Sequence, residues 1–169
     1  MSQIGDAVAR ASAYLNEHPG EARYRDSAAT ARLGRNLRVD VTGAGGEAIA
    51  TDMPRGIGGE ATVPSPGFLF RAAAAACVAS LIGIRAATLG IDLAPGDVEV
   101  TVDSESDDRG ILGLDDAIPA GALSVKVVVR FAGPKIGHEA GAALARWALD
   151  HCPVTEASAR PVPIELEVA

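Results

Sequence analysis

The chain has 169 residues, the size of one ordinary domain. It carries 15 Lys and Arg against 22 Asp and Glu, a net charge of −7 with no basic run, so its composition argues against binding to nucleic acid or to an anionic membrane. Hydrophobic residues make up 48% of the chain but aromatic residues only 4%. Alanine is the commonest of these hydrophobic residues. Small side chains each bury little area, so a core built from them gains from contact with a second copy. This is a first indication of a dimer.

Neither the N-terminus nor the longest apolar stretch resembles a membrane segment. Residues 1–20 carry charges throughout and contain no apolar segment of the kind found in signal peptides. Residues 68–84 are mostly alanine and are interrupted by Arg71, which is typical of a buried helix. We therefore expect a cytoplasmic protein without membrane association. In that reducing compartment, two cysteines favour a transient or catalytic role over a permanent disulfide.

The first half of the chain predicts a helix, a meander of short strands and a long helix. Hydrophobic spacing predicts a helix at 6–16. Three short strands, separated by glycine-containing turns, follow at 28–33, 36–41 and 47–51. A loop rich in Gly and Pro covers 52–66. Ser65 suits the N-cap and Pro66 the first position of the next helix, which runs to about Leu89 before Gly90.

The second half predicts two long strands, a helix and a last strand, at 98–104, 123–131, 137–151 and 162–168, with a polar connection at 107–121. This order indicates an α+β fold with antiparallel sheets and segregated helices. We divide the chain into an N-terminal helical extension, residues 1–25, and one domain, residues 26–169.

The residue types alone leave the chemistry open. Cys77 lies in the most apolar helix and Cys152 at a helix end, and both positions also suit a structural thiol. Two cysteines cannot form a zinc site by themselves, and the three histidines are scattered. The acidic pairs at 107–108 and 115–116 are best explained as solvated loop residues. We expect no metal and no cofactor.

Several motifs together resemble the OsmC/Ohr family. They are TDMPRGIGGE at 51–60, PSP at 64–66, AAAAAC at 72–77, DRG at 108–110 and HCPV at 151–154. The resemblance extends from about residue 28 to the C-terminus and favours the less characterised OsmC-like branch.

The resemblance implies a thiol-dependent peroxidase that reduces organic hydroperoxides. It implies an intertwined homodimer in which antiparallel sheets wrap two long central helices. Cys77 would be the nucleophile that becomes a sulfenic acid, and Cys152 the resolving thiol that forms a disulfide with it. An external dithiol would then restore the pair by exchange.

A reactive thiolate at Cys77 needs a nearby cation, and Arg55 is the preferred candidate. Arg71 is a weaker candidate, and the early-strand arginines Arg32, Arg35 and Arg38 stay open because Ohr-type proteins take theirs from that region. Family members usually carry a glutamate after the Ser-Pro, where this chain has Gly67. Glu60 is the expected substitute for that carboxylate.

Two other functions are compatible with the same resemblance. The loss of the glutamate at Gly67 favours an OsmC-like module that binds a small apolar molecule or senses redox state, with weak or no peroxidase activity. The third possibility is a purely structural oligomer whose thiols are inert.

Overall fold

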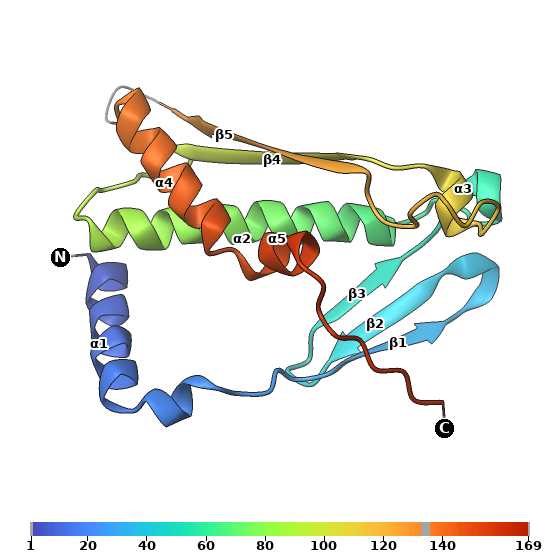
Figure 1. Ribbon diagram of the computed structural model, residues 1–169, viewed down its shortest axis with the longest axis horizontal. Coiled ribbons are helices and arrows are strands. Elements are labelled where there is room, and N and C mark those ends of the chain that lie inside the picture. Colours follow the sequence, from blue (N-terminus) through green and yellow to red (C-terminus); the bar gives the residue numbers. More distant parts are fainter. Residues whose placement is uncertain (1, 133–135, 169) are drawn as a thin grey trace. The chain divides into compact units, whose positions relative to one another are not determined.

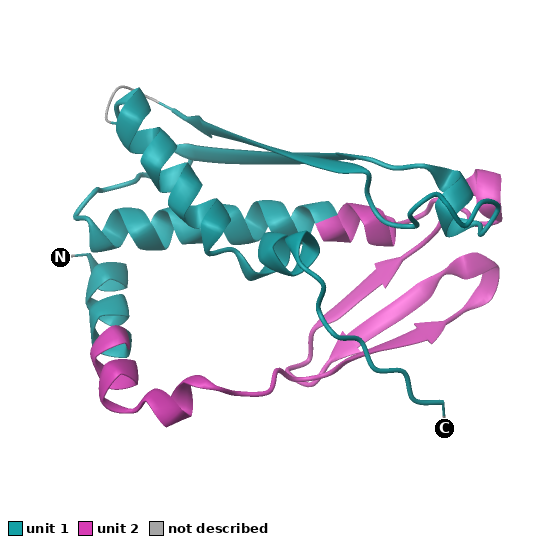
Figure 2. Cartoon of the chain, viewed as in Figure 1, with its two compact units in different colours: residues 1–11, 71–169 teal, residues 12–70 magenta. Residues whose placement is uncertain are grey.

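The computed structural model describes residues 2–132 and 136–168, and the chain forms two compact units (Figure 2). One unit comprises Met1–Ala11 and Arg71–Ala169, and the other comprises Ser12–Phe70. Helices and strands follow one another along the chain as α-βββ-α-β-α-β-α-α, and both sheets are antiparallel, which confirms the predicted α+β class. The division at residue 25 stays a prediction.

The unit Ser12–Phe70 contains a three-stranded antiparallel sheet (Figure 1). Its strands β1 (Ala29–Leu33), β2 (Val39–Gly43) and β3 (Ala48–Thr51) lie in the order β1-β2-β3, so all three predicted strands are confirmed. β2 begins three residues later than predicted because Arg35–Leu37 forms a 3-10 turn. Asn36 and Leu37 in this turn have left-handed backbone conformations, with φ of 51° and 64°, which a strand cannot accommodate.

The long helix α2 (Pro66–Thr88) begins as the sequence predicts. The Ser65 hydroxyl accepts a hydrogen bond from the Phe68 N–H at 3.2 Å, which is an N-cap contact. In the unit that contains most of the helix, one face is buried at a spacing of four residues: Ala74, Val78, Ile82 and Ala86. This face forms a core cluster with Leu144, Ala148 and Cys152.

Two long strands cover part of this core. β4 (Val98–Glu105) pairs antiparallel with β5 (Ser124–Phe131), in a register that sets Val98 opposite Phe131 and Val100 opposite Val129. The valines on this face pack against the core cluster, while their neighbours in the chain alternate to the other face. The strand predictions at 98–104 and 123–131 are thus confirmed.

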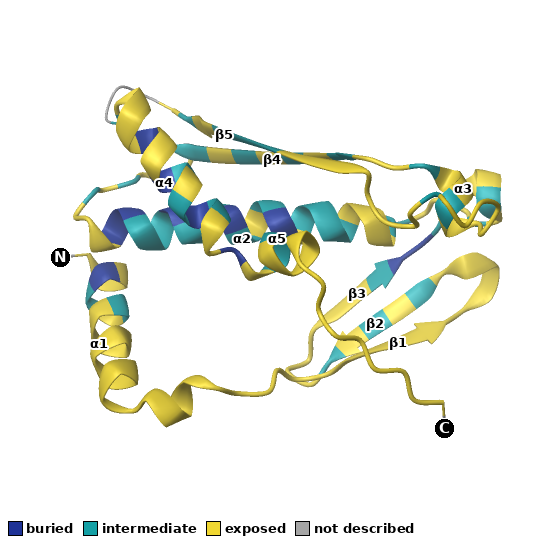
Figure 3. Ribbon diagram, in the orientation of Figure 1, coloured by how far each residue is buried: buried dark blue, intermediate teal, exposed yellow. Residues whose placement is uncertain are grey.

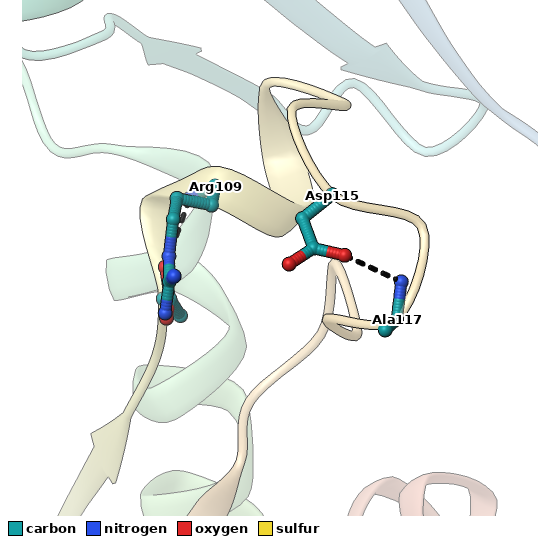
Figure 4. Close-up of polar contacts among 4 residues, drawn as sticks. Arg109, Asp115 and Ala117 are labelled. Atoms are coloured by element: carbon teal, nitrogen blue, oxygen red, sulfur yellow. Dashed lines mark hydrogen bonds and ion pairs between the residues drawn. The ribbon is translucent and has the colours of Figure 1, made fainter.

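Acidic residues stabilise the connection between β4 and β5, which contains the short helix α3 (Asp108–Ile111). Asp107 pairs with the Arg109 guanidinium at 2.6 Å. Asp115 accepts a hydrogen bond from the Ala117 N–H at 3.0 Å (Figure 4). Local pairing therefore explains Asp107 and Asp115 without a bound ligand.

The C-terminal part departs from prediction in two places. Helix α4 (His138–Asp150) is confirmed, but a further helix, α5 (Pro153–Ala159), follows with Cys152 at its N-cap. The sequence analysis places Cys152 at a helix end, and Pro153 suits the first position of the helix that follows. The predicted strand at 162–168 is wrong, because this segment has no regular secondary structure and no hydrogen-bonded neighbour among the described residues.

Much apolar surface stays exposed. By length and hydropathy α2 could cross a membrane, the one such helix among the described residues, and only 17% of its most apolar window is buried. Apolar side chains are exposed on each unit (Figure 3), among them Leu33, Ile49, Phe68, Ile164, Leu166 and Val168. The N-terminal helix α1 (Gln3–Glu17) is also exposed along most of its length. A lone chain thus leaves many apolar side chains exposed.

Candidate active site

The fold brings the two cysteines together. Cys77 lies in the middle of α2, and Cys152 lies between α4 and α5. Both are free thiols: Cys152 is 0% exposed within the core cluster, and the half-buried Cys77 packs against that cluster. The cysteines are about 75 residues apart in sequence, so it is the packing of α4 and α5 on α2 that creates the pair.

The environments of the two thiols shift their pKa values in opposite directions. Burial raises the pKa of Cys77, and the hydrogen bond that its thiol makes with Cys152 raises it further. Burial also acts to raise the pKa of Cys152. Hydrogen bonds outweigh this effect and hold the pKa of Cys152 below its usual value. They come from the Thr155 hydroxyl and N–H, from Cys77 and from the Val154 N–H. The two thiols are thus hydrogen-bonded to each other, and their pKa values are shifted apart.

Thr155 is a residue of this site that the sequence analysis missed. It follows Cys152 by three positions, the spacing at which an N-cap side chain meets a helix. Its hydroxyl lies 3.2 Å from the carbonyl oxygens of Leu149 and Cys152, which fixes the backbone around the thiol. A Cys-Pro-X-Thr pattern at a helix start would have been the available signal.

Arg71 and His151 both contact residues other than the two cysteines. Arg71 donates a hydrogen bond to the Ser104 hydroxyl of β4 at 3.4 Å. His151 stacks on Trp147, with ring centroids 4.2 Å apart, and its Nδ1 lies 2.8 Å from the Trp147 carbonyl oxygen. Both side chains thus have structural contacts of their own.

Arg55 and Glu60 lie in the other unit, on the loop at 52–64. Arg55 begins a 3-10 turn, and its Nε donates a hydrogen bond to the backbone carbonyl of Glu60 at 3.3 Å. The Glu60 carboxylate instead accepts a hydrogen bond from the Asn36 side chain at 2.8 Å. The backbone of Glu60, not its carboxylate, therefore holds Arg55. That Arg55 supports Cys77 stays a prediction.

The early arginines belong to the same unit as Arg55. Arg35 lies in the 3-10 turn beside Asn36, and Arg38 pairs with Asp40 at 3.5 Å on an exposed surface. Arg32 lies on the exposed strand β1.

A second missed residue, Asp52, organises the loop that carries Arg55. Asp52 is only 2% exposed. A hydrogen bond from the Thr62 N–H lowers the pKa of the Asp52 carboxyl below its usual value, although burial acts to raise that pKa. The Thr62 hydroxyl and the N–H groups of Glu60 and Met53 lower the pKa further. An acid at the start of a Gly- and Pro-rich loop is a known turn signal.

We expect the stabilising effect of Asp52 to be lost in acid. Because its pKa is lower in the folded than in the unfolded chain, its contribution is complete above the unfolded value of about 4 and fades as the pH falls through the folded value. Asp52→Asn removes this contribution. The difference in urea midpoint between wild type and Asp52→Asn should therefore be largest near neutral pH and shrink toward pH 3.

The exposed Asp26 provides a control with the same charge change in the same unit. Asp26→Asn should give a small difference at every pH. A constant difference for Asp52→Asn from pH 7 to pH 3 would contradict the expectation.

No metal-binding arrangement is evident in the described parts of the chain. Across residues 2–132 and 136–168, no three His, Cys, Asp or Glu side chains gather closely enough to hold an ion. Within the unit that contains most of α2, the site is best described by its two thiols.

Comparison with known structures gives the same fold repeatedly. An organic hydroperoxide resistance protein OsmC from Legionella pneumophila is 28% identical, with a TM-score of 0.61 over 80% of this chain and 90% of that one. An organic hydroperoxide resistance protein from Elizabethkingia anophelis is 23% identical (TM-score 0.63, 80% and 89%). An OsmC-like protein from Mycoplasma pneumoniae is 13% identical (TM-score 0.67, 81% and 89%).

A search of curated protein sequences returned no significant match. The family model described as OsmC-like protein matches residues 59–167, well over half of the chain. This range includes α2, the β4–β5 hairpin and both cysteines. The chain therefore belongs to the OsmC-like protein family.

Proposed function

We propose that this protein reduces organic hydroperoxides, with Cys77 as the attacking thiol and Cys152 as the resolving thiol. The observation that carries the proposal is the contact between the two cysteines inside the core of one unit. Similarity to proteins described as organic hydroperoxide resistance proteins supports the choice of substrate.

The reaction requires two thiols and one external dithiol. The Cys77 thiolate attacks the terminal oxygen of the hydroperoxide; an S–O bond forms, the O–O bond breaks, and the alkoxide takes a proton to leave as an alcohol. The Cys152 sulfur then attacks the resulting sulfenic acid, releasing water and forming a disulfide. A dithiol reduces this disulfide by exchange and is itself oxidised.

The exposures of the thiols fit these roles. A hydroperoxide can reach the half-buried Cys77 more readily than the fully enclosed Cys152. Because burial raises the pKa of Cys77, however, little thiolate is present near neutral pH unless a cation stabilises it. We assign that role to an arginine of the unit Ser12–Phe70, with Arg55 preferred and Arg35 as the alternative.

We further propose that the protein works as a soluble cytoplasmic homodimer, without nucleic acid or membrane partners. The segment at 162–168 alternates apolar and polar residues as a strand does, yet its apolar side chains at 164, 166 and 168 are 92%, 88% and 86% exposed. A strand of a second copy would bury them and pair their backbone. The half-covered helix α2 likewise suits a helix from a partner.

We expect a dimer of the 17.1 kDa chain in sedimentation experiments. Ile164→Ser with Leu166→Ser should raise the dimer dissociation constant at least about a hundredfold, because each buried side chain contributes roughly 1.5–3 kcal/mol. Glu165→Gln with Glu167→Gln, on the alternate positions, serves as the matched control. A monomer at micromolar concentration, or equal effects of the two pairs, would contradict this arrangement.

A binding or redox-sensing module is the second candidate. It is favoured by Gly67, which leaves the helix start without the carboxylate found in catalytic relatives, and by the raised pKa of Cys77. Such a module would oxidise once per chain and not turn over.

Steady-state kinetics separates these functions. We expect wild-type protein to consume many equivalents of cumene hydroperoxide with dithiothreitol or dihydrolipoamide, and to consume hydrogen peroxide more slowly. Consumption limited to one equivalent per chain would favour the sensor. No consumption, with both thiols slow toward a thiol probe in the folded state, would indicate a structural role.

A further inference from the structure

The loop at 52–64 is organised around one enclosed carboxylate. Both oxygens of Asp52 are used: Oδ1 accepts hydrogen bonds from the N–H groups of Met53 and Glu60 at 2.8 and 3.2 Å. Oδ2 accepts hydrogen bonds from the Thr62 N–H at 3.0 Å and from the Thr62 hydroxyl at 2.9 Å. All four donors belong to the loop that Asp52 begins, so its carboxylate fixes the path of this loop.

Backbone hydrogen bonds also shape the loop. Five of them lie within it, donated by the N–H groups of Asp52, Ile57, Gly58, Gly59 and Ala61. Ala61 has a left-handed backbone with φ of 53°, an unfavourable conformation for a residue with a side chain. Most loop residues are exposed or half-buried, so apolar packing contributes little. Asp52 accepts four hydrogen bonds from this loop, more than any other side chain within it.

A single residue, Glu60, connects Asp52 to Arg55. The Glu60 N–H donates to Asp52, and the Glu60 carbonyl accepts from Arg55 Nε at 3.3 Å. Glu60 and Thr62, two of the residues that donate to Asp52, also line an open cavity of about 510 Å³ together with Arg55 and Gly59. The carboxylate therefore sets the backbone that Arg55 contacts.

The same loop is tied to the turn that carries Arg35. The Asn36 side chain donates to the Glu60 carboxylate at 2.8 Å, and Asn36 itself has a left-handed backbone. Three non-glycine residues with positive φ, namely Asn36, Leu37 and Ala61, thus gather around Glu60. Strained backbone of this kind is typical of functional sites that need fixed geometry.

We propose that Asp52 is a positioning residue that holds the loop 52–64 in the conformation presenting Arg55, and through Arg55 controls the reactivity of Cys77. This inference rests on the proposed function of Arg55 as the cation that supports Cys77. In this proposal the backbone of Glu60 connects Asp52 to Arg55. The Glu60 carboxylate holds the neighbouring turn through its hydrogen bond with Asn36.

The test measures the rate of Cys77 alkylation by iodoacetamide between pH 5 and pH 9.5. Every protein carries Cys152→Ser, so that only one thiol reacts. The variants are Arg55→Gln, Asp52→Asn and the two combined, with Asp26→Asn as the matched control. The pH profile reports the apparent pKa of Cys77, which a simple loss of stability would not move.

We expect Arg55→Gln and Asp52→Asn each to raise that apparent pKa and to lower the rate at pH 7, by about tenfold for each pKa unit. The combined variant should react no more slowly than Arg55→Gln alone, because both changes act through one group. Asp26→Asn should match the reference protein.

Two results would overturn the inference while leaving Arg55 in its role. In the first, Arg55→Gln shifts the pH profile of Cys77 alkylation but Asp52→Asn does not. In the second, the two substitutions reduce the alkylation rate independently, so that their effects multiply in the combined variant. An unshifted profile for Arg55→Gln would instead refute the role of Arg55 in the proposed function, and the inference with it.

If Asp52→Asn does not fold, a milder variant takes its place. Thr62→Val removes only the hydroxyl donor to Oδ2 and should shift the profile in the same direction by less. Thr62→Ser keeps that hydroxyl and should restore the reference profile. Equal profiles for Thr62→Val and Thr62→Ser would count against the proposal.

Discussion

Replacing Cys77 with serine is expected to abolish organic hydroperoxide reduction, with a fall in kcat/KM of roughly a thousandfold or more. A hydroxyl at this position is not ionised near neutral pH and cannot form the S–O bond that begins the reaction. The helix α2 should be unaffected, because serine and cysteine are similar in size and residue 77 is only half-buried. Turnover of cumene hydroperoxide with a dithiol provides the measurement.

Ser80→Ala is the matched control for this experiment, since Ser80 is an exposed residue on the same helix. It should retain nearly full activity. If Cys77→Ser kept more than about a tenth of wild-type activity, another residue would have to be the nucleophile.

Replacing Cys152 with serine is expected to separate the first chemical step from the second. Cys77 should still react once with hydroperoxide, but its sulfenic acid has no neighbouring thiol with which to condense. We expect the sulfenic acid to accumulate and to be trapped by dimedone, and steady-state turnover with a dithiol to fall by about tenfold or more. Mass spectrometry without reductant measures both products.

Wild-type protein is the reference for this second experiment. After one equivalent of hydroperoxide it should show a disulfide between Cys77 and Cys152 and no dimedone adduct. Full turnover by Cys152→Ser, combined with no disulfide in wild type, would make Cys152 a packing residue rather than the resolving thiol.

The sequence predicted most elements of the fold because their signals are local. Ser65 and Pro66 mark the start of α2, and alternating valines mark β4 and β5. The strand at 162–168 shows the limit of this reasoning. Alternation indicates which side chains can share a face, but a strand also needs a neighbour for its backbone, and periodicity does not identify one.

The site was predictable only in part. Motifs identified Cys77 and Cys152, but their contact arises from α4 and α5 packing on α2, which no local pattern specifies. Asp52 was overlooked because an acid in a Gly- and Pro-rich loop is usually solvated. Its enclosure depends on Glu60 and Thr62, whose N–H groups turn inward only when the loop has folded.

The enclosure of Cys152 has an evolutionary consequence. Cys152 belongs to one core cluster with Val78, Ile82 and Leu144. The residues that pack α2 against α4 therefore also enclose the proposed resolving thiol. Selection for a well-packed interior and selection for rapid resolution therefore act on the same positions. In this chain, a substitution in that cluster is therefore expected to change both the free energy of unfolding and the proposed resolution step.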